Sequence, residues 1–364
     1  MTLEFDTGGM DLLSGAEKQI ITPDWCRRNS EVSAGIMLSI LQQNYGNHNL
    51  TRDIRSLTQQ MSEGRIDMFI ETINHLPVSC AALIELSQWE VELGRGAKIP
   101  SEKGGHSGPM IEAFNSWLEG RSFPKSKILK AEVRTAKPTK EVPGEIATEV
   151  VCLKKIGFKP TAIGPFFGHG VPFRQEFFFL ASMFRNQDDL EVLLDRLPSV
   201  PNNIFRNRDE FLVFTSFWQN FFGREPAFSR GTEQRNYGLR YASNFQGPFI
   251  QISPNESGDF GADELMPFLQ QEGFNKGQRL AIARLPLSAS NPDLESQISH
   301  LKNSGFKLVG FEPSVGEGGP RVDILFGILS DETKRKLVLP VFAEGLFDHE
   351  IENSLMTISI NWRK

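Results

Sequence analysis

The chain has 364 residues, and 39 Lys and Arg against 45 Asp and Glu give it a net charge of −6. Its length predicts about two domains, and its acidic balance excludes proteins whose main task is to neutralise nucleic-acid phosphates. No stretch approaches the roughly 18 apolar residues of a membrane-spanning helix, the start lacks a secretory signal pattern, and three scattered cysteines disfavour a disulfide framework. We therefore expect a cytoplasmic α/β protein with no membrane or nucleic-acid partner.

Apolar periodicity predicts the elements of the first half in chain order. Two helices open it, and the glycine-rich segment 100–108 separates the third strand from the third helix. On that strand Glu90 and Glu92 alternate with apolar residues, so the two carboxylates share one face. The predicted elements are helices over 34–41, 50–61, 109–118 and 146–156, and strands over 67–74, 78–85, 89–99, 128–134, 161–167 and 176–183.

The chain repeats itself at an offset of 148 residues. Residues 153–159 read LKKIGFK, and residues 301–307 read LKNSGFK. Over the 26 positions 153–178, ten residues are identical to those 148 positions later. This period is far longer than the roughly 20–50 residues of solenoid repeats, so it predicts two copies of one domain. The predicted organisation is an N-terminal domain over 1–185, a linker over 186–203 and a C-terminal domain over 204–364.

The back half of the second copy follows the same order of elements. Its front half, between residues 202 and 246, is hard to match to the first copy. The final run, 356–362, alternates as a strand does and predicts an added strand. The other predicted elements are strands over 248–253, 280–285, 308–311 and 322–329, and helices over 263–271 and 292–303.

The third strand, the glycine-rich loop and the helix after it resemble the GNAT superfamily of acyl-CoA-dependent N-acyltransferases. The LKKIGFK stretch is similar to the helix end before that family's sixth strand, and the closing pair of strands also fits. The resemblance covers residues 33–183 well and residues 248–329 in weaker form. It implies an α/β (α+β) fold with two tandem GNAT-like domains, the second degenerate, each a mixed, mostly antiparallel sheet flanked by helices.

The resemblance also implies acyl-CoA or acetyl-CoA as co-substrate, bound by the first domain. In the family a (Gln/Arg)-x-x-Gly-x-(Gly/Ala) loop holds the CoA pyrophosphate on backbone N–H groups and a helix N-terminus. This chain departs from the pattern, because Lys103 takes the Gln/Arg place and His106 replaces the middle glycine. The residues expected to bind CoA are Ala97, Lys98, Ile99, Lys103, Gly104, Gly105, His106, Ser107 and Gly108.

The matching loop of the second copy, 253–263, carries three acidic residues and no basic one. Like charge repels a diphosphate, so the second domain is predicted not to hold CoA there. Six phenylalanines in the first copy, at 166, 167, 173 and 177–179, suggest an acyl chain longer than acetyl. The alternative is that they join the two domains.

Acyl transfer to an amine requires a base for the amine, donors for the oxyanion and a proton for the leaving thiolate. Enzymes of the family often use a carboxylate on the strand before the loop, which makes Glu92 and Glu90 the candidate bases. The alternative is that both point to solvent. The family's tyrosine acid falls on Leu153 here, and the adjacent Cys152 is more simply a small core residue.

The function expected from the resemblance is an N-acyltransferase that moves acyl groups other than aminoacyl from acyl-CoA to an amine. The acceptor would be a small molecule or a peptide, no metal is expected, and a homodimer is left open. The alternative is a catalytically inactive GNAT-like binding or assembly module.

Overall fold

The computed structural model describes the chain in segments. The glycine-rich loop with Lys103, Gly104, Gly105 and His106 lies outside the described residues. The described residues are 18–45, 53–99, 107–135, 150–165, 177–229, 240–246, 249–254, 260–271, 274, 280–288, 291 and 293–364.

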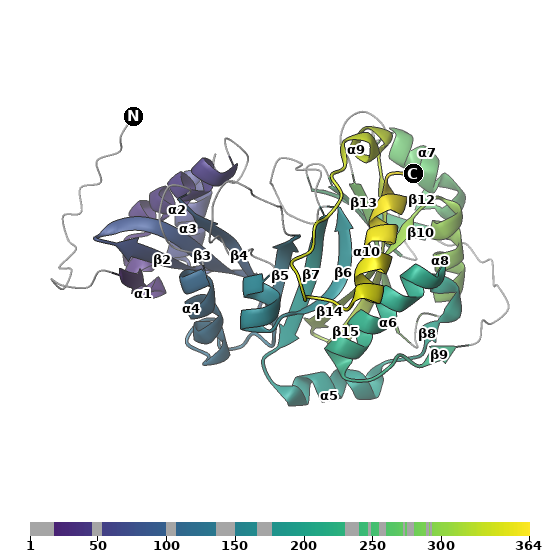
Figure 1. Ribbon diagram of the computed structural model, residues 1–364, viewed down its shortest axis with the longest axis horizontal. Coiled ribbons are helices and arrows are strands. Elements are labelled where there is room, and N and C mark those ends of the chain that lie inside the picture. The colour runs from purple at the N-terminus through teal and green to yellow at the C-terminus, as the bar shows by residue number, and fades with distance from the viewer. Residues whose placement is uncertain are drawn as a thin grey trace.

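One sheet of 13 strands runs through both halves of the molecule (Figure 1). Its order is β1-β2-β3-β4-β5-β7-β6-β14-β15-β13-β11-β10-β12, and β8 and β9 form a separate pair. The strands are β1 (Lys18–Ile21), β2 (Ile66–Ile73), β3 (Leu76–Ser87), β4 (Glu90–Lys98), β5 (Ile128–Arg134), β6 (Lys159–Pro165), β7 (Phe177–Phe184), β8 (Val200–Pro201), β9 (Phe228–Ser229), β10 (Arg240–Gln246), β11 (Phe249–Pro254), β12 (Phe260–Gly261), β13 (Leu280–Leu287), β14 (Lys307–Gly316) and β15 (Gly319–Leu329).

Within the large sheet the pairs β4–β5 and β11–β13 are parallel, and the other described pairs are antiparallel. Each parallel pair is followed by two antiparallel partners, β7 and β6 in the first half and β15 and β14 in the second. The structure is therefore a mixed α/β fold with a large mixed sheet, as the class predicted from the sequence requires.

Helices cover both faces of the sheet. In the first half α1, α2 and α3 lie on one face, where Met68 and Ala82 point, and α4 lies on the other, where Phe69 and Leu83 point. The alternation of side chains along β2 and β3 produces these two apolar faces. The helices are α1 (Pro23–Arg28), α2 (Ser30–Tyr45), α3 (Ile54–Ser62), α4 (Ser107–Leu118), a π-helix (Val150–Ile156), α5 (Gln187–Arg196), α6 (Arg208–Phe222), α7 (Leu265–Gln271), α8 (Leu294–Asn303), α9 (Asp331–Lys336) and α10 (His349–Trp362), with short 3-10 turns at Asn202–Ile204 and Ala262–Glu264.

The end of the chain is a helix, so the strand predicted over 356–362 is wrong. Asp348 caps α10 by accepting a hydrogen bond from the Ile351 N–H group. Ile351, Leu355, Ile358 and Trp362 are all buried at spacings of four, three and four residues, which is the period of an amphipathic helix. Helix α10 packs on α6 at the right of Figure 1.

The two halves of the sheet meet at a seam between β6 and β14. The seam is a single antiparallel bridge between Ala162 and Gly310. Gly310 has φ +147°, and a Cβ on it would lie 2.4 Å from the carbonyl oxygen of Thr161. Each strand bulges beside the bridge, at Thr161 in β6 and at Val309 in β14. Glycine is required at this position because the two backbones approach too closely for any side chain.

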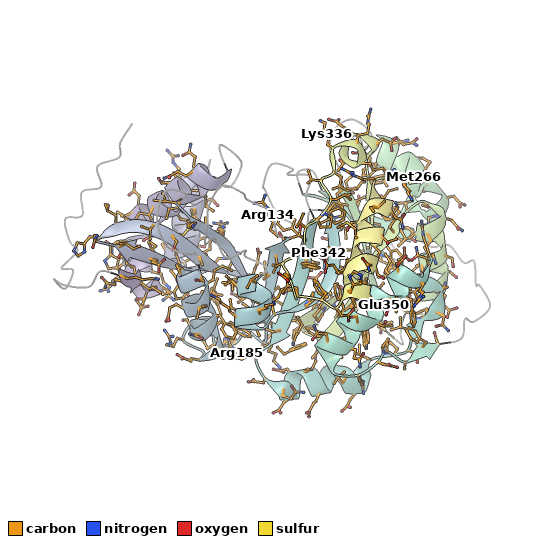
Figure 2. The ribbon with its side chains drawn as sticks, in the orientation of Figure 1. Arg134, Arg185, Met266, Lys336, Phe342 and Glu350 are labelled. Atoms are coloured by element: carbon orange, nitrogen blue, oxygen red, sulfur yellow. The ribbon has the colours of Figure 1, made fainter. Side chains whose placement is uncertain are left out.

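Two phenylalanines of β7, Phe177 and Phe179, lie in the hydrophobic core. Phe179 is fully buried and packs against Phe217 of α6, 6.2 Å between ring centres. It also packs against Phe347 and Phe342, which come from the segment before α10; Figure 2 labels Phe342. Phe177 is buried in the same core. Of the remaining four, Phe166, Phe167 and Phe173 lie outside the described residues, and Phe178 is half-buried.

The segment 186–203, expected as a linker, contains α5, the strand β8 and the start of a 3-10 turn. The charges at the ends of α5 interact favourably with the helix dipole, because Asp188 and Asp189 lie in the first turn and Arg196 lies in the last. Helix α5 lies against β7 and β15. This segment is therefore folded onto the sheet at the boundary between the halves.

Candidate active site

A cavity of about 130 Å³ opens where the two halves meet. It lies on the face of β4 and β5 opposite α4, because Val91, Leu93 and Leu129 point toward α4 while Glu92 and Glu132 line the cavity. Strands β5 and β7 supply one wall, and β11, β13 and β14 supply the other. The polar and charged lining residues are Glu92, Lys130, Glu132, Ser182, Gln251, Arg284 and Glu312.

The cavity forms where β4 and β5 separate. The two strands pair over only three residues, from Glu90–Ile128 to Glu92–Lys130. Beyond that point β4 bulges against β3, with Arg95 at φ +53°. A bulge bends and twists its strand, so β4 turns away while β5 continues along β7.

Glu92 lies beside this separation. A Cβ on Gly94 would sit 2.8 Å from Glu92 Oε1, so the carboxylate occupies the space that the glycine leaves open. Glu92 lies in the cavity wall, and its role as a base stays a prediction.

Glu132, two residues beyond the last β5 residue paired with β4, is the second carboxyl group of the cavity. Burial raises its pKa well above the usual carboxyl value, and the negative charges of Glu92 and Glu312 raise it further, against the opposing effect of Arg284. No hydrogen bond or ion pair holds Glu132 among the residues that the structure describes. A half-buried carboxyl with a raised pKa is the type of group that serves as a general base near neutral pH.

Glu90 is held in a different way, as part of a chain of charges across the halves. Its carboxylate binds Lys130 Nζ at 3.0 Å and accepts a hydrogen bond from the Val315 N–H group at 2.7 Å. Lys130 also binds Glu312 of β14 at 2.8 Å, and Glu312 pairs with Arg284 of β13. Glu90, proposed as a base from the sequence, therefore has the geometry of a structural ion-pair partner.

These pairs set the charge states around the cavity. Burial by itself would raise the pKa of Glu312, but Arg284 and Lys130 outweigh it and lower that pKa to about 2. Burial would lower the pKa of Lys130, and Glu312 and Glu90 outweigh it and raise that pKa. Glu312 therefore stays ionised and Lys130 stays charged, so neither group is suited to exchange a proton with a substrate near neutral pH.

Sequence analysis missed Glu132, Arg284 and Glu312. A local signal existed for the first, because Lys130 and Glu132 alternate with buried Leu129, Ala131 and Val133 and must share a face. The other two residues lie more than 150 positions further along the chain, and no local pattern brings them to the same cavity.

The described residues expected to bind CoA lie at the end of β4 and the start of α4. Ala97 and Lys98 are buried in the β3–β4 pairing, and the Ile99 N–H group donates to the Val78 carbonyl. Ser107 and Gly108 are the first residues of α4. The segment 100–106 that joins these ends lies outside the described residues, so the geometry of the predicted pyrophosphate loop stays a prediction.

A buried carboxylate stands close to the start of α4. A Cβ on Gly108 would lie 2.8 Å from Glu71 Oε1. Glu71 binds Lys18 Nζ at 2.5 Å and accepts a hydrogen bond from Ser79 at 2.8 Å. The negative charge is therefore already balanced by Lys18 at the end of the helix where an anion would bind.

Cys152 and Leu153 supply no general acid. Cys152 is buried in the core, and burial raises the pKa of its thiol to about 12. Leu153 packs against the same core. Among the described residues no cluster of His, Cys, Asp and Glu is placed to hold a metal ion. None of the described helices is long and apolar enough to cross a membrane.

Comparison with solved structures returns acetyltransferases of the GNAT type over about half of the chain. An aminoglycoside 6'-N-acetyltransferase from Enterococcus faecium matches 46% of this chain and 97% of its own, with 9% identity and a TM-score of 0.34. A spermidine N-acetyltransferase from Vibrio cholerae, in complex with CoA and spermine, matches 47% and 97%, with 12% identity and a TM-score of 0.31. No family model and no curated protein matches the sequence.

Proposed function

We propose that the protein is an acyl-CoA-dependent N-acyltransferase whose reaction takes place where β4 and β5 separate. The observation that carries the proposal is the end of β4–β5 pairing at Glu92–Lys130, beside a cavity that holds two carboxyl groups, Glu92 and Glu132. The carboxyl groups supply the base that an incoming ammonium needs.

Glu132 is the proposed base, and Glu92 is the proposed partner for the ammonium. Glu132 takes a proton from the ammonium, which leaves a neutral amine with a free electron pair. When bound, acyl-CoA supplies the thioester carbonyl that this amine attacks. The new C–N bond forms, the C–S bond breaks, and the thiolate takes up the second proton released by the nitrogen. The charge of Glu92 raises the pKa of Glu132, which strengthens Glu132 as a base.

The proposed position of the CoA pyrophosphate is the start of α4 with the loop before it. Helix α4 has 12 residues and follows β4 directly after the loop. Its N-terminus attracts anions, and Lys103 adds a cation on the loop. The donor is proposed to be acetyl-CoA or a short acyl-CoA, because the Phe177 and Phe179 side chains lie in the core and not in the cavity.

We also propose that the chain contains two copies of one domain, meeting near residues 186–203. The order β4-β5-β7-β6 in the first half is matched by β11-β13-β15-β14 in the second, each with one parallel pair. The seam joins Ala162 to Gly310, which are 148 positions apart, as the sequence repeat is. The bulges at Thr161 and Val309 have the same offset. These features support a local two-fold axis through the seam.

A second candidate, an inactive binding module, is favoured by Glu71. Its carboxylate, paired with Lys18, already stands within reach of the positive α4 N-terminus, which leaves less attraction there for a diphosphate. The two candidates differ in whether the purified protein turns over acyl-CoA in the presence of an amine.

The test uses the full chain with acetyl-CoA and a panel of primary amines, with release of free CoA thiol as the readout. The wild type is expected to release thiol in an amine-dependent way. Glu132→Gln is expected to lower kcat by about 100-fold or more, because a base contributes roughly 10²–10⁴ to the rate, with little change in the KM for acetyl-CoA.

Glu119→Gln is the matched control, since Glu119 is exposed and pairs with Arg121. It should behave as the wild type. Glu92→Gln should raise the KM for the amine more than it lowers kcat. If acetyl-CoA neither binds nor turns over with any amine, the inactive module is the better description. If Glu132→Gln keeps its rate, Glu132 is not the base.

A further inference from the structure

A second cavity, of about 290 Å³, lies at the turn between β14 and β15. Helix α5, which lies against β15 (Figure 1), forms one wall, and the end of β13 forms another. The described lining of this cavity shares no residue with that of the cavity at the seam. The proposed acyl transfer therefore makes no use of it.

Arg196, the last residue of α5, holds its guanidinium over the hairpin turn. Its Nη1 lies 2.9 Å from the position that a Cβ would take on Gly319, so the glycine makes room for it. Within the described part of the chain this guanidinium has no carboxylate partner and no hydrogen bond. A carbonyl in the last turn of α5, that of Leu194, is bound by Arg224 instead. Arg196 therefore has its five N–H donors available for a ligand.

Arg321, at the start of β15, is the second cation of this cavity. Its Nε donates to Ser314 Oγ at 3.0 Å, which holds the side chain beside the turn. Asp323 Oδ1 lies 3.8 Å from the same nitrogen and offsets part of its charge. The side chain is still 62% exposed, and its two terminal nitrogens make no hydrogen bond to a described residue. These nitrogens are therefore also available for a ligand.

We infer that the second cavity binds a small dicarboxylic acid, with one carboxylate on Arg196 and the other on Arg321. A guanidinium binds a carboxylate through two parallel N–H···O hydrogen bonds, so two arginines match two carboxylates. The inference goes beyond the proposed function and does not rest on it.

The charge of the lining favours an anion. Arg196 and Arg321 face one carboxylate, that of Glu317 in the turn, so the described lining has a net charge of 2 − 1 = +1, whereas the whole chain has −6. Glu317 is exposed and pairs with no cation among the described residues. Its charge opposes an incoming anion, so its removal should strengthen binding.

The size and the apolar walls of the cavity limit the ligand. A volume of about 290 Å³ corresponds to roughly ten water molecules in the liquid, which suits a molecule of about ten non-hydrogen atoms. Leu193 of α5 and Leu287 of β13 are buried and line it with apolar surface, and this suits a few methylene groups between the two acids. Nothing lies within 4 Å of a Cβ on Gly316 or Gly318, so the cavity is open along the turn.

The experiment measures the binding of succinate, glutarate and adipate to the full chain by calorimetry. The three acids differ only in the number of methylene groups, and glutaramide is the uncharged analogue of glutarate. At least one acid is expected to bind with a Kd below about 1 mM. It should bind at least about tenfold more tightly than glutaramide, because hydrogen bonds between two charged groups are about twice as strong as neutral ones.

Variants of the charged lining residues test the site itself. Arg196→Met and Arg321→Met should each weaken binding of the best acid by at least about tenfold, and Arg196→Lys should recover part of the loss, because lysine keeps the charge but not the planar fork. Glu317→Gln should strengthen binding by about two- to threefold. Arg208→Met, which alters an exposed arginine on α6 paired with Glu350, is the matched control and should bind as the wild type does. Equal thermal unfolding midpoints without ligand check that the variants fold.

Three results would overturn the inference. They are the absence of any acid with a Kd below about 1 mM, equal binding of glutaramide and glutarate, and unchanged binding in Arg196→Met. Inorganic phosphate is the alternative oxyanion, and binding of phosphate without any of the three acids would also show that the dicarboxylate assignment is wrong. Dicarboxylate binding that depends on Arg196 supports the inference even if acetyl-CoA is never turned over, so the two proposals fail separately.

Discussion

The two parallel strand pairs of the sheet are alike in geometry and opposite in chemistry. In the first half β4 and β5 pair over three residues and then part beside Glu92 and Glu132. In the second half β11 and β13 pair over four residues and then part beside Arg284. The same backbone arrangement therefore presents carboxyl groups in one half and a guanidinium in the other.

This difference shows that the site does not belong to either half alone. Glu312 of the second half accepts a hydrogen bond from Lys130 of the first half, and the Val315 N–H group of the second half donates to Glu90 of the first. Charges that would each be costly to bury singly are buried together across the seam. The second half is thus part of the cavity wall and not only a support for the first.

The largest expected effect breaks this link between the halves. Lys130→Met leaves Glu90 and Glu312 buried without their shared cation, and loss of one partner from a buried pair costs about 3–5 kcal/mol. We expect urea unfolding to show that loss in the free energy of unfolding. Lys127→Met, which removes a half-buried lysine paired with Asp189 at the surface, should cost about 1 kcal/mol or less. Equal effects of the two variants would mean that the charge chain does not join the halves.

A smaller effect is expected at the seam itself. Gly310→Ala places a Cβ 2.4 Å from the Thr161 carbonyl oxygen, at a positive φ that alanine adopts poorly, so it should destabilise the protein by at least about 2 kcal/mol. Gly316→Ala is the control on the same strand, where nothing lies within 4 Å of the added Cβ, and it should change stability by about 0.5 kcal/mol or less. A Gly310→Ala protein as stable as the control would show that the seam does not need the close approach.

The smallest expected effect is a difference between Glu132 and Glu90 in how each carboxyl group makes the stability of the protein depend on pH. Because the folded pKa of Glu132 is raised mainly by burial, the folded protein holds this proton more tightly than the unfolded chain. Its stability should therefore fall as pH rises from the usual carboxyl pKa to the raised value. Glu132→Gln removes this loss and should be more stable than wild type at pH 8, by on the order of 1 kcal/mol, with a smaller difference at pH 5.

Thermal unfolding across pH measures this, and Glu90→Gln provides the contrast. Glu90 is paired with Lys130 and held by the Val315 N–H group, so its substitution should lower stability at pH 8. A stabilised Glu90→Gln variant, or a destabilised Glu132→Gln variant, would reverse the roles given to the two residues.

Local patterns in the sequence predicted most elements of the first half. The strand β5 has the bounds expected from its alternation, and β4 and α4 begin or end within about two residues of the expected positions. Alternation also placed Glu90 and Glu92 on one face. The same reasoning failed at the end of the chain. The apolar residues of 356–362 fit the period of two that predicts a strand, and together with Ile351 and Leu355 they also fit the period of 3.6 that predicts a helix. Packing on α6 decides for the helix.

The sequence by itself determined the elements, the 148-residue repeat and the presence of carboxyl groups before a glycine-rich loop. Only the tertiary structure decided which of the carboxyl groups are held in ion pairs. Alternation along the strand places Glu90 and Glu92 on the same face. In the structure, Lys130 and the Val315 N–H group bind the Glu90 carboxylate. Glu132, on the neighbouring strand, has no ion pair among the described residues. The physical reason is that burial and charge depend on neighbours up to 225 positions away, which no local period encodes.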